Sequence, residues 1–244
     1  MGVRTDLHFH LLPGVDDGPR DVEDALELAR MAVADGTGRI VATPHVRSIA
    51  VAQLPERVEQ LLARLREAGI GLDVRGGGEL SPDDVGSLTD TELDTLAQGP
   101  AGRRWLLLEA PLYATDPDLE TAAAELRARG FAVLIAHPER SRSTPLSHIR
   151  ALVALGACLQ INASSLAGAH GREAERAGLA LARSGMPFVL ASDAHSASRP
   201  PLLTVAAQRL ATGGVDPAAI SVAADTGPER LLLGGLPAAA WFGQ

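Results

Sequence analysis

Short apolar runs alternate along the chain with longer segments whose apolar residues recur at helical spacing. The short runs are rich in β-branched residues and predict strands at 3–10, 40–43, 72–75, 105–108, 131–136, 158–162 and 187–191. The longer segments predict helices at 22–33, 54–68, 117–129, 145–155, 171–184 and 200–212. This alternation is typical of an α/β fold with parallel strands and right-handed crossovers. Seven strands predict a distorted TIM-like (β/α)7 barrel, less regular than the usual eight-stranded one, in a single domain over 1–244.

Two stretches depart from the alternation. Residues 81–100 carry little apolar pattern, and we expect short helices there, above the rim of the barrel. The tail, 213–244, predicts one or two packing helices that end in an Ala-rich apolar segment. Its Trp241-Phe242 pair could pack on the barrel or on a second subunit, so the sequence leaves the oligomeric state open.

Composition narrows the class of protein. The chain has 244 residues, 46% of them hydrophobic, which is enough for one α/β domain with a substantial core. Its formal net charge of -8 and the lack of a Lys/Arg run argue against a nucleic-acid partner. The one cysteine, Cys158, excludes an intramolecular disulfide. No stretch reaches the ~20 apolar residues that span a bilayer, and no signal region precedes the first strand, so we expect a cytoplasmic protein without membrane insertion.

Residues able to bind metal gather where the predicted strands end. The carboxyl ends of parallel barrel strands meet on one face, so side chains at those ends converge. Five of the seven histidines and several carboxylates hold such positions: His8, His10, His45, Glu79, Glu109, His137, Asp193 and His195. Nitrogen and oxygen ligands gathered in this way can hold several divalent cations. The pattern therefore indicates a multinuclear metal site and an enzyme.

Each position also has an ordinary structural explanation. A strand-end histidine can bond nearby backbone, Glu109 can pair with an arginine, and Asp193 can cap a following helix. The Asp16-Asp17-Gly18 stretch can be a simple turn. The set as a whole favours metal, because random placement would not put nearly every histidine at a strand exit. We interpret the other two, His148 in a helix and His170 in a loop, as surface residues.

Two pairs of candidate ligands share an i, i+2 spacing. Residues two apart on a strand point to the same side, so His8 and His10 can reach one cation. Asp193 and His195 repeat this spacing at the end of the last predicted strand. Barrel closure makes the first and last strands neighbours, so we expect the two pairs to face each other across the rim.

Several motifs together resemble one known superfamily. They are His8-Phe9-His10, Pro13-Gly14-Val15-Asp16-Asp17-Gly18, Ala42-Thr43-Pro44-His45, Gly78-Glu79, Glu109, Ala136-His137-Pro138-Glu139-Arg140 and Ser192-Asp193-Ala194-His195. As a set they resemble the PHP (polymerase and histidinol phosphatase) superfamily. The Pro-Gly-x-Asp-Asp-Gly loop and the His-Pro-Glu-Arg stretch resemble its manganese-dependent protein-tyrosine phosphatases of bacterial capsule and exopolysaccharide operons. The resemblance covers almost the whole chain, from near residue 3 to near residue 235.

The resemblance implies a PHP-type barrel with ligands for three divalent cations. The three sets are His8, His10, Glu79 and Asp193; Glu79, Glu109 and His137; and Asp17, His45 and His195, with Glu79 bridging the first two. The choice of Asp17 over Asp16 follows only from the motif register, so both stay open. The resemblance favours manganese, while iron and zinc suit the same imidazole and carboxylate ligands.

The resemblance also implies hydrolysis of a phosphate ester. Arg140 and Arg199 would bind the phosphoryl group, and Arg47 is a weaker third candidate. A water shared by the cations would be ionised near neutral pH and would attack phosphorus in line. A tyrosyl leaving group has a pKa of about 10 and needs little help from an acid, although Asp17 or a water on the metal could donate the proton.

A cysteine-dependent mechanism is excluded by the sequence. It needs a thiolate followed at a fixed spacing by an arginine in a phosphate-binding loop. Ser164 stands six residues after Cys158, no glycine-rich loop surrounds them, and Cys158 is predicted to lie in a core strand. At the exit of that strand, Asn162, Ser164 and Ser165 are expected to contact substrate or the metal ligands, or else to form a Ser/Asn-rich turn.

Three functions compete. The first is a metal-dependent protein-tyrosine phosphatase whose partner is a phosphotyrosine protein, the tail of a bacterial tyrosine kinase in polysaccharide export. The second is a small-molecule phosphatase such as histidinol-phosphate phosphatase, and the third is a non-catalytic domain that metal stabilises. The Asp16-Asp17-Gly18 loop and the compact length favour the first.

Overall fold

The computed structural model describes residues 3–112, 119–142 and 144–236. Within them, eight strands form two sheets: β1 (Arg4–Phe9), β2 (Thr37–Ala42), β3 (Asp73–Gly76), β4 (Glu79–Leu80), β5 (Trp105–Glu109), β6 (Ala132–Ala136), β7 (Cys158–Asn162) and β8 (Phe188–Ala191). Strands β1 to β3 form one sheet and β4 to β8 the other, each in sequence order. Every pairing is parallel, so the predicted α/β class is confirmed.

The expected count of seven strands was wrong for the described residues, because a glycine run divides the third strand region in two. Strand β3 pairs with β2 as far as Gly76, and β4 then pairs with β5. A Cβ on Gly77 would lie 2.7 Å from Cγ1 of Val41, and one on Gly78 would lie 2.8 Å from Cδ2 of Leu96. Only glycine permits this close passage. The chain thereby changes sheets directly before Glu79.

Single bridges join the two sheets along both edges. Phe9 pairs with Ala194, and His45 pairs with Glu79. The amide of His10 donates to the Ala194 carbonyl at 2.9 Å, and the amide of Glu79 donates to the Pro44 carbonyl at 3.0 Å. The first and last strands are therefore neighbours, as expected. Backbone pairing gives two sheets held edge to edge, not one continuous closed ladder.

One apolar cluster is shared by the two sheets. It takes residues from β1, β2, β5, β6, β7 and β8: Leu7, Val41, Trp105, Leu107, Leu134, Ala136, Cys158 and Val189. Helix α11 (Gly227–Gly234) adds Leu231 and Leu232, and the indole N–H of Trp105 donates to the Leu231 carbonyl at 2.8 Å. Cys158 is a buried strand residue, as predicted. This cluster fills the space beneath the strand ends that carry the polar site.

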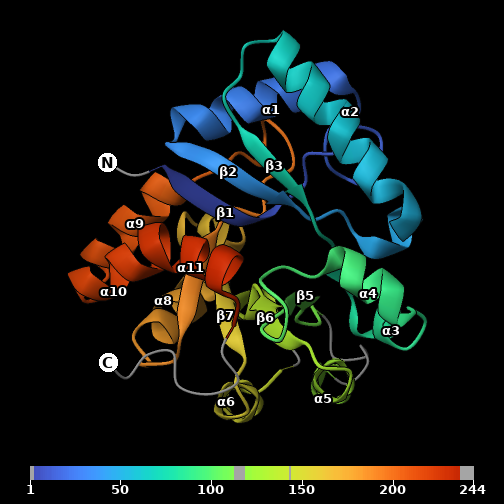
Figure 1. Ribbon diagram of the computed structural model, residues 1–244. Helices are drawn as coiled ribbons and strands as arrows, with labels where there is room; N and C mark the ends of the chain where they lie inside the picture. Colours follow the sequence, from blue (N-terminus) through green and yellow to red (C-terminus); the bar gives the residue numbers. More distant parts are fainter. Residues whose placement is uncertain (1–2, 113–118, 143, 237–244) are drawn as a thin grey trace.

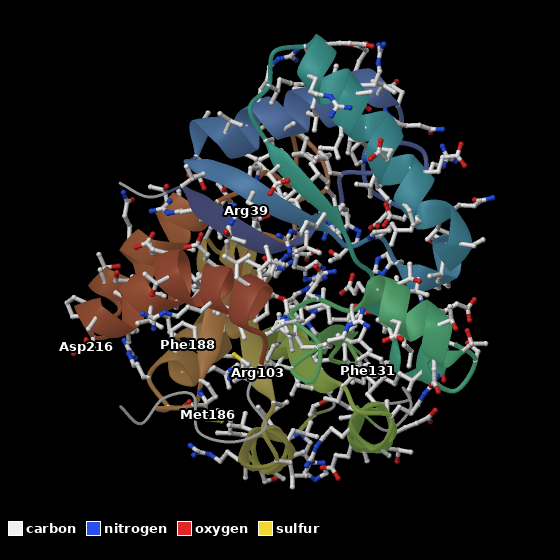
Figure 2. The ribbon with its side chains drawn as sticks, viewed as in Figure 1. Arg39, Arg103, Phe131, Met186, Phe188 and Asp216 are labelled. Atoms are coloured by element: carbon white, nitrogen blue, oxygen red, sulfur yellow. The ribbon has the colours of Figure 1, made fainter. Side chains whose placement is uncertain are left out.

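The predicted helices are confirmed within a few residues of their expected ends. They are α1 (Val22–Ala34), α2 (Leu54–Glu67), α5 (Leu119–Ala128), α6 (Leu146–Ala154), α8 (Gly171–Ala182) and α9 (Leu203–Thr212). Figure 1 shows α1 and α2 beside the three-stranded sheet and α5, α6 and α8 around the other. Their apolar faces pack on the strands in a second, larger cluster that includes Phe131 and Phe188, labelled in Figure 2.

The two irregular stretches also contain helices. Residues 81–100 form α3 (Pro82–Val85) and α4 (Asp90–Leu96), which confirms the short helices expected there. In the tail, α10 (Pro217–Ser221), a π-helical turn η4 (Val222–Thr226) and α11 follow one another, while Trp241-Phe242 lies outside the described residues. Four shorter elements complete the described fold: η1 (Val46–Ser48), η2 (Val51–Gln53), η3 (Pro138–Arg140) and α7 (Ala163–Leu166). Among the described residues, the helices lack the length and apolar character needed to span a membrane.

Candidate metal centre

Four predicted ligands converge where β1 and β8 end and β4 begins. Nε2 of His8 lies 3.2 Å from Oε2 of Glu79 and 3.3 Å from Oδ1 of Asp193. Nε2 of His10 lies 3.2 and 3.5 Å from the same two oxygens. The two imidazole nitrogens are themselves 3.2 Å apart, and all four side chains are buried. The pair His8 and His10 therefore faces the pair that begins at Asp193, as predicted.

The donor set of this first group fits a divalent cation. Nδ1 of His8 lies 3.1 Å from Oε1 of Gln160, and Nδ1 of His10 lies 2.7 Å from Oδ2 of Asp16. An acceptor at Nδ1 holds the ring proton there and leaves the lone pair of Nε2 directed into the group. Two lone pairs and two carboxylate oxygens then meet at one point. Buried polar atoms need a partner, and a cation would satisfy all four at once.

A second group shares Glu79 with the first. Oε1 of Glu79 lies 3.0 Å from Nε2 of His137, whereas Oε2 faces His8 and His10. Nε2 of His137 is also 3.9 Å from Oε1 of Glu109. Ligand atoms of His45, Glu79 and Glu109 lie within 4.8 Å of one another. Glu79 is thus placed to bridge two ions, as the predicted ligand sets require.

A third group lies beside the first. Oδ1 of Asp17 is 3.3 Å from Nε2 of His195 and 3.5 Å from Nε2 of His45. Nδ1 of His195 is held 2.8 Å from the Asp193 carbonyl, which again leaves Nε2 for the group. Ligand atoms of His10 lie within 4.8 Å of these three side chains. The structure thus brings all nine predicted ligands together.

The two acids of the loop after β1 have different neighbours. Besides His10, Asp16 accepts hydrogen bonds from the backbone amides of His45 and Gly18, each at 3.0 Å. Its carboxylate therefore orients a histidine and fixes the loop. The side chain of Asp17 is more than half exposed, and its carboxylate contacts His195 and His45 in the third group. The geometry favours Asp17 as the ligand and gives Asp16 a positioning role.

Electrostatics in the groups follow from burial and close pairing. Burial alone would raise the pKa of Glu79, but His8, His10 and His137 hold that pKa well below its ordinary value. Burial raises the pKa of Glu109, and the charge of Glu79 adds to that effect. For His10, burial favours the neutral form, yet bonds to Asp16 and Glu79 raise the pKa to about 10. A metal ion would have to displace that proton.

Two predicted ligands have an unusual backbone. His137 and Asp193 have φ values of 31° and 51°, and they are the non-glycine residues with positive φ among the described residues. Such conformations cost about 1–3 kcal/mol and persist where surrounding contacts fix them. The amide of His137 donates to Oε1 of Gln160 at 3.0 Å, and that of Asp193 donates to the His8 carbonyl at 2.9 Å. These bonds turn both side chains toward the site.

Both predicted phosphate-binding arginines reach the site. Nη1 of Arg140 donates to Oδ2 of Asp193 at 2.9 Å, and Nη2 of Arg199 donates to the same oxygen at 3.2 Å. Arg199 also contacts Oδ2 of Asp17 at 3.3 Å. Arg47 is exposed in η1, directly after His45. Arg140 and Arg199 therefore lie at the edge of the metal-ligand groups.

At the end of β7, sequence reasoning missed Gln160, whereas it expected Asn162 to contact substrate or the metal ligands or to form a turn. Gln160 contacts His8 and His137, and Nδ2 of Asn162 donates to Oδ2 of Asp193 at 2.7 Å. The i, i+2 spacing of Gln160 and Asn162 is the signal that could have identified Gln160, because it repeats the spacing of His8 and His10. Asn162 also accepts from the Ser164 amide and begins helix α7, so it contacts a predicted ligand and forms a local cap as well.

The interpretation of His170 as a surface residue was wrong. Its side chain is half-buried, with Nε2 2.8 Å from Oγ of Ser164, because the unpredicted helix α7 turns the chain back toward the site. Burial, and then the charge of Arg140, lower the pKa of His170 to about 4. His148 is exposed on α6, as expected, and pairs with Glu120 at 2.8 Å.

Imidazoles and carboxylates gathered at the strand ends of a parallel α/β fold are typical of a metal-dependent enzyme. The profile of the family described as capsular polysaccharide synthesis, CpsB/CapC, matches residues 4–221. The chain therefore belongs to the CpsB/CapC family, which confirms the resemblance found in the sequence.

Individual relatives agree with this assignment. The chain is 35% identical over 208 residues to the tyrosine-protein phosphatase YwqE of Bacillus subtilis, covering 78% of this chain and 77% of YwqE. It is 28% identical over 217 residues to the tyrosine-protein phosphatase CpsB of Streptococcus agalactiae serotype III, covering 82% and 87%.

Solved structures extend the comparison to the fold. A structure from work on YwqE and on CpsB of Streptococcus pneumoniae, described as unique metal-dependent tyrosine phosphatases, superposes with a TM-score of 0.81. It is 30% identical and covers 96% of this chain and 95% of that one. The phosphotriesterase homology protein of Escherichia coli superposes with a TM-score of 0.65 at 16% identity, covering 93% and 98%, and shares the fold alone.

Proposed function

We propose that this protein is a metal-dependent protein-tyrosine phosphatase. The observation that carries the proposal is the convergence of His8, His10, Glu79 and Asp193 on one buried point. Membership of the CpsB/CapC family supports it, because relatives in the comparison bear the name of tyrosine-protein phosphatases.

We assign three divalent cations, manganese first among the candidates, to the three groups. Glu79 would bridge the first two, with Glu109 and His137 completing the second. Asp17, His45 and His195 would hold the third. When bound, the cations supply a water that is acidic enough to ionise near neutral pH and offset charge on the phosphoryl oxygens.

Residues of the chain would orient the phosphate ester and offset its negative charge. Arg140 and Arg199 present guanidinium groups at the edge of the site, where they would hold phosphoryl oxygens in a fixed direction. The bond between phosphorus and the tyrosyl oxygen breaks, a bond to the oxygen of water forms, and the phenolate takes up a proton. Hydrogen bonds from His195 and then His45 hold the pKa of Asp17 far below its usual range. The Asp17 carboxylate therefore stays ionised, and it suits the role of ligand better than that of proton donor.

The description of the family supports a proposal for the physiological substrate. We propose the phosphorylated tail of a bacterial tyrosine kinase in polysaccharide export, since the family is described by capsular polysaccharide synthesis. We also propose that residues 1–244 are one domain and that the two sheets form a distorted barrel of the PHP type. The apolar cluster shared by both sheets and the bridges at both edges support the barrel.

The proposal is tested by comparing two substrates. Metal-stripped protein is refilled with manganese and given a phosphotyrosine peptide or histidinol phosphate. We expect manganese-dependent release of phosphate from the peptide, abolished in His137→Ala and Asp193→Ala and retained in His148→Ala, the matched exposed histidine. Preference for histidinol phosphate would overturn the proposed substrate class. If metal-loaded protein hydrolysed neither compound, the assignment as an enzyme would be overturned.

A further inference from the structure

A cavity of about 940 Å³ lies beside the metal-ligand groups, between η3 and α8. Its lining includes Arg140, Arg142, His170, Arg172, Ala174 and Ala177. Pockets of ~300–1,000 Å³ bury drug-sized ligands, so this one exceeds what a single side chain of a substrate would fill. None of the predicted metal ligands belongs to the lining.

Two chains of contacts connect the cavity to Asp193. Arg140 lines the cavity and donates to Oδ2 of Asp193 at 2.9 Å. His170 lies 2.8 Å from Oγ of Ser164, which donates to Oδ1 of Asn162 at 2.8 Å. Nδ2 of Asn162 in turn donates to the same oxygen of Asp193. A group hydrolysed at the metal centre would therefore have its neighbouring atoms at the mouth of this cavity.

The lining contains three arginines and two glutamates, Glu139 and Glu173, and so has a small positive excess, although the whole chain carries a net charge of -8. Arg142 and Arg172 are exposed. Arg142 approaches Glu173 at 4.0 Å, while Arg172 makes no ion pair with any part of the chain that the structure describes. Such a lining complements an anionic ligand.

The remaining lining is suited to a polypeptide. Ala174 and Ala177 provide a small apolar surface on α8, and His170 is neutral near pH 7 because burial and then Arg140 lower its pKa to about 4. The arginines therefore carry the positive charge of this surface. A peptide with an acidic residue next to its phosphotyrosine would place backbone on the alanines and its carboxylate beside the arginines.

We propose that this cavity binds the polypeptide beside the phosphotyrosine and selects an acidic flanking residue through Arg142 and Arg172. The inference rests on the proposed function and adds the substrate class that the site prefers. It assigns to the cavity lining at 139–142 and 170–177, outside the metal ligands, the discrimination between protein substrates.

The test compares kcat/KM for free phosphotyrosine, a peptide with acidic flanks and the same peptide with lysine flanks, using manganese-loaded protein. We expect the wild type to favour the acidic peptide. In Arg142→Glu/Arg172→Glu, the ratio of kcat/KM for the acidic peptide to that for phosphotyrosine should fall about tenfold, because the exposed ion pairs with the acidic flank are lost and the charge is reversed. Arg30→Glu/Arg66→Glu carries the same charge change on exposed residues of α1 and α2 and should leave this ratio unchanged.

A second variant tests whether peptide binding depends on the free space in the cavity. Ala177→Trp should raise KM for both peptides relative to phosphotyrosine, because the indole would fill part of the cavity. An unchanged peptide ratio in both cavity variants, or an equal fall in the control variant, would overturn the proposal. Failure of the wild type to hydrolyse phosphotyrosine would instead overturn the proposed function. In that case, fluorescence anisotropy of the acidic peptide with the same variants decides the cavity proposal separately.

Discussion

Asn162 holds one oxygen of Asp193 and leaves the other for the metal site. Its Nδ2 donates to Oδ2 of Asp193 at 2.7 Å, and Arg140 and Arg199 donate to the same oxygen. Oδ1 of Asp193 faces His8 and His10. The carboxylate is therefore divided between a side that the chain fixes and a side directed at the proposed cation.

Removing the amide of Asn162 should weaken metal binding. We expect Asn162→Ala to lower manganese affinity by about 10–100-fold, the range for residues that orient a ligand. Calorimetric titration of metal-stripped protein measures this. Asn162 also caps α7, so Ser164→Ala, which removes the hydroxyl contacts to Asn162 and His170 but keeps the amide of Asn162, serves as the comparison. Equal affinity in Asn162→Ala and wild type would show that the arginines alone orient Asp193.

Neutralising Glu79 should abolish activity without unfolding the protein. Its two oxygens face His8, His10 and His137 from opposite sides, so the amide of Glu79→Gln cannot replace both contacts. We expect a loss of more than about 100-fold in kcat/KM on a phosphotyrosine peptide. Glu92→Gln, which changes an exposed cap of α4, is the matched control and should retain activity. Comparable activity of the two variants would contradict the bridging role.

Cys158 should be chemically inert and dispensable. Burial raises the pKa of its thiol to about 12, so almost no thiolate forms near neutral pH. We expect Cys158→Ala to keep its phosphatase activity and to lose about 1 kcal/mol of unfolding free energy from the core. Iodoacetamide should leave native wild-type protein active. Inactivation by the reagent would reopen the thiol mechanism that the sequence excludes.

Asp6 should make stability depend on pH. Burial raises its pKa from 3.8 to about 6, against hydrogen bonds from Ser192 and His8 that lower it. The folded state therefore favours the protonated carboxyl, and this stabilisation is complete below the unfolded pKa and lost as pH rises through the folded pKa. Relative to Asp6→Asn, the wild type should lose about 3 kcal/mol of unfolding free energy between about pH 4 and pH 8. Urea unfolding of metal-free protein at both pH values checks this, and a constant difference would refute it.

The sequence predicted those parts of the site that depend on strand ends. The i, i+2 pairs at His8 and His10 and at Asp193 and His195 report backbone geometry directly, and they face each other in the structure. The predicted number of strands was wrong at Gly77 and Gly78, because residue propensities do not show where a chain passes from one sheet to another. Such a crossing is set by tertiary contacts.

Residues that act through other residues were harder to identify. Asp16 and Asp17 are adjacent and chemically identical, and only the folded loop separates their neighbours. His170 follows α7, a helix of four residues that is too short to leave a periodic pattern. Its burial therefore depends on a turn that local sequence does not reveal.

The two sheets share few backbone bonds, and the proposed ligands come from both. His8, His10, Asp17 and His45 belong to the three-stranded side, whereas Glu79, Glu109, His137, Asp193 and His195 belong to the five-stranded side. Bound cations would therefore resist separation of the two halves, and losing them would favour local opening. The amides of His10 and Glu79, which donate across the two edges, would then exchange with deuterium much faster. The amide of Leu134, whose strand is paired on both sides, would keep its slow exchange. Metal supply to the cell would in this way set the molecule's susceptibility to proteolysis as well as its activity.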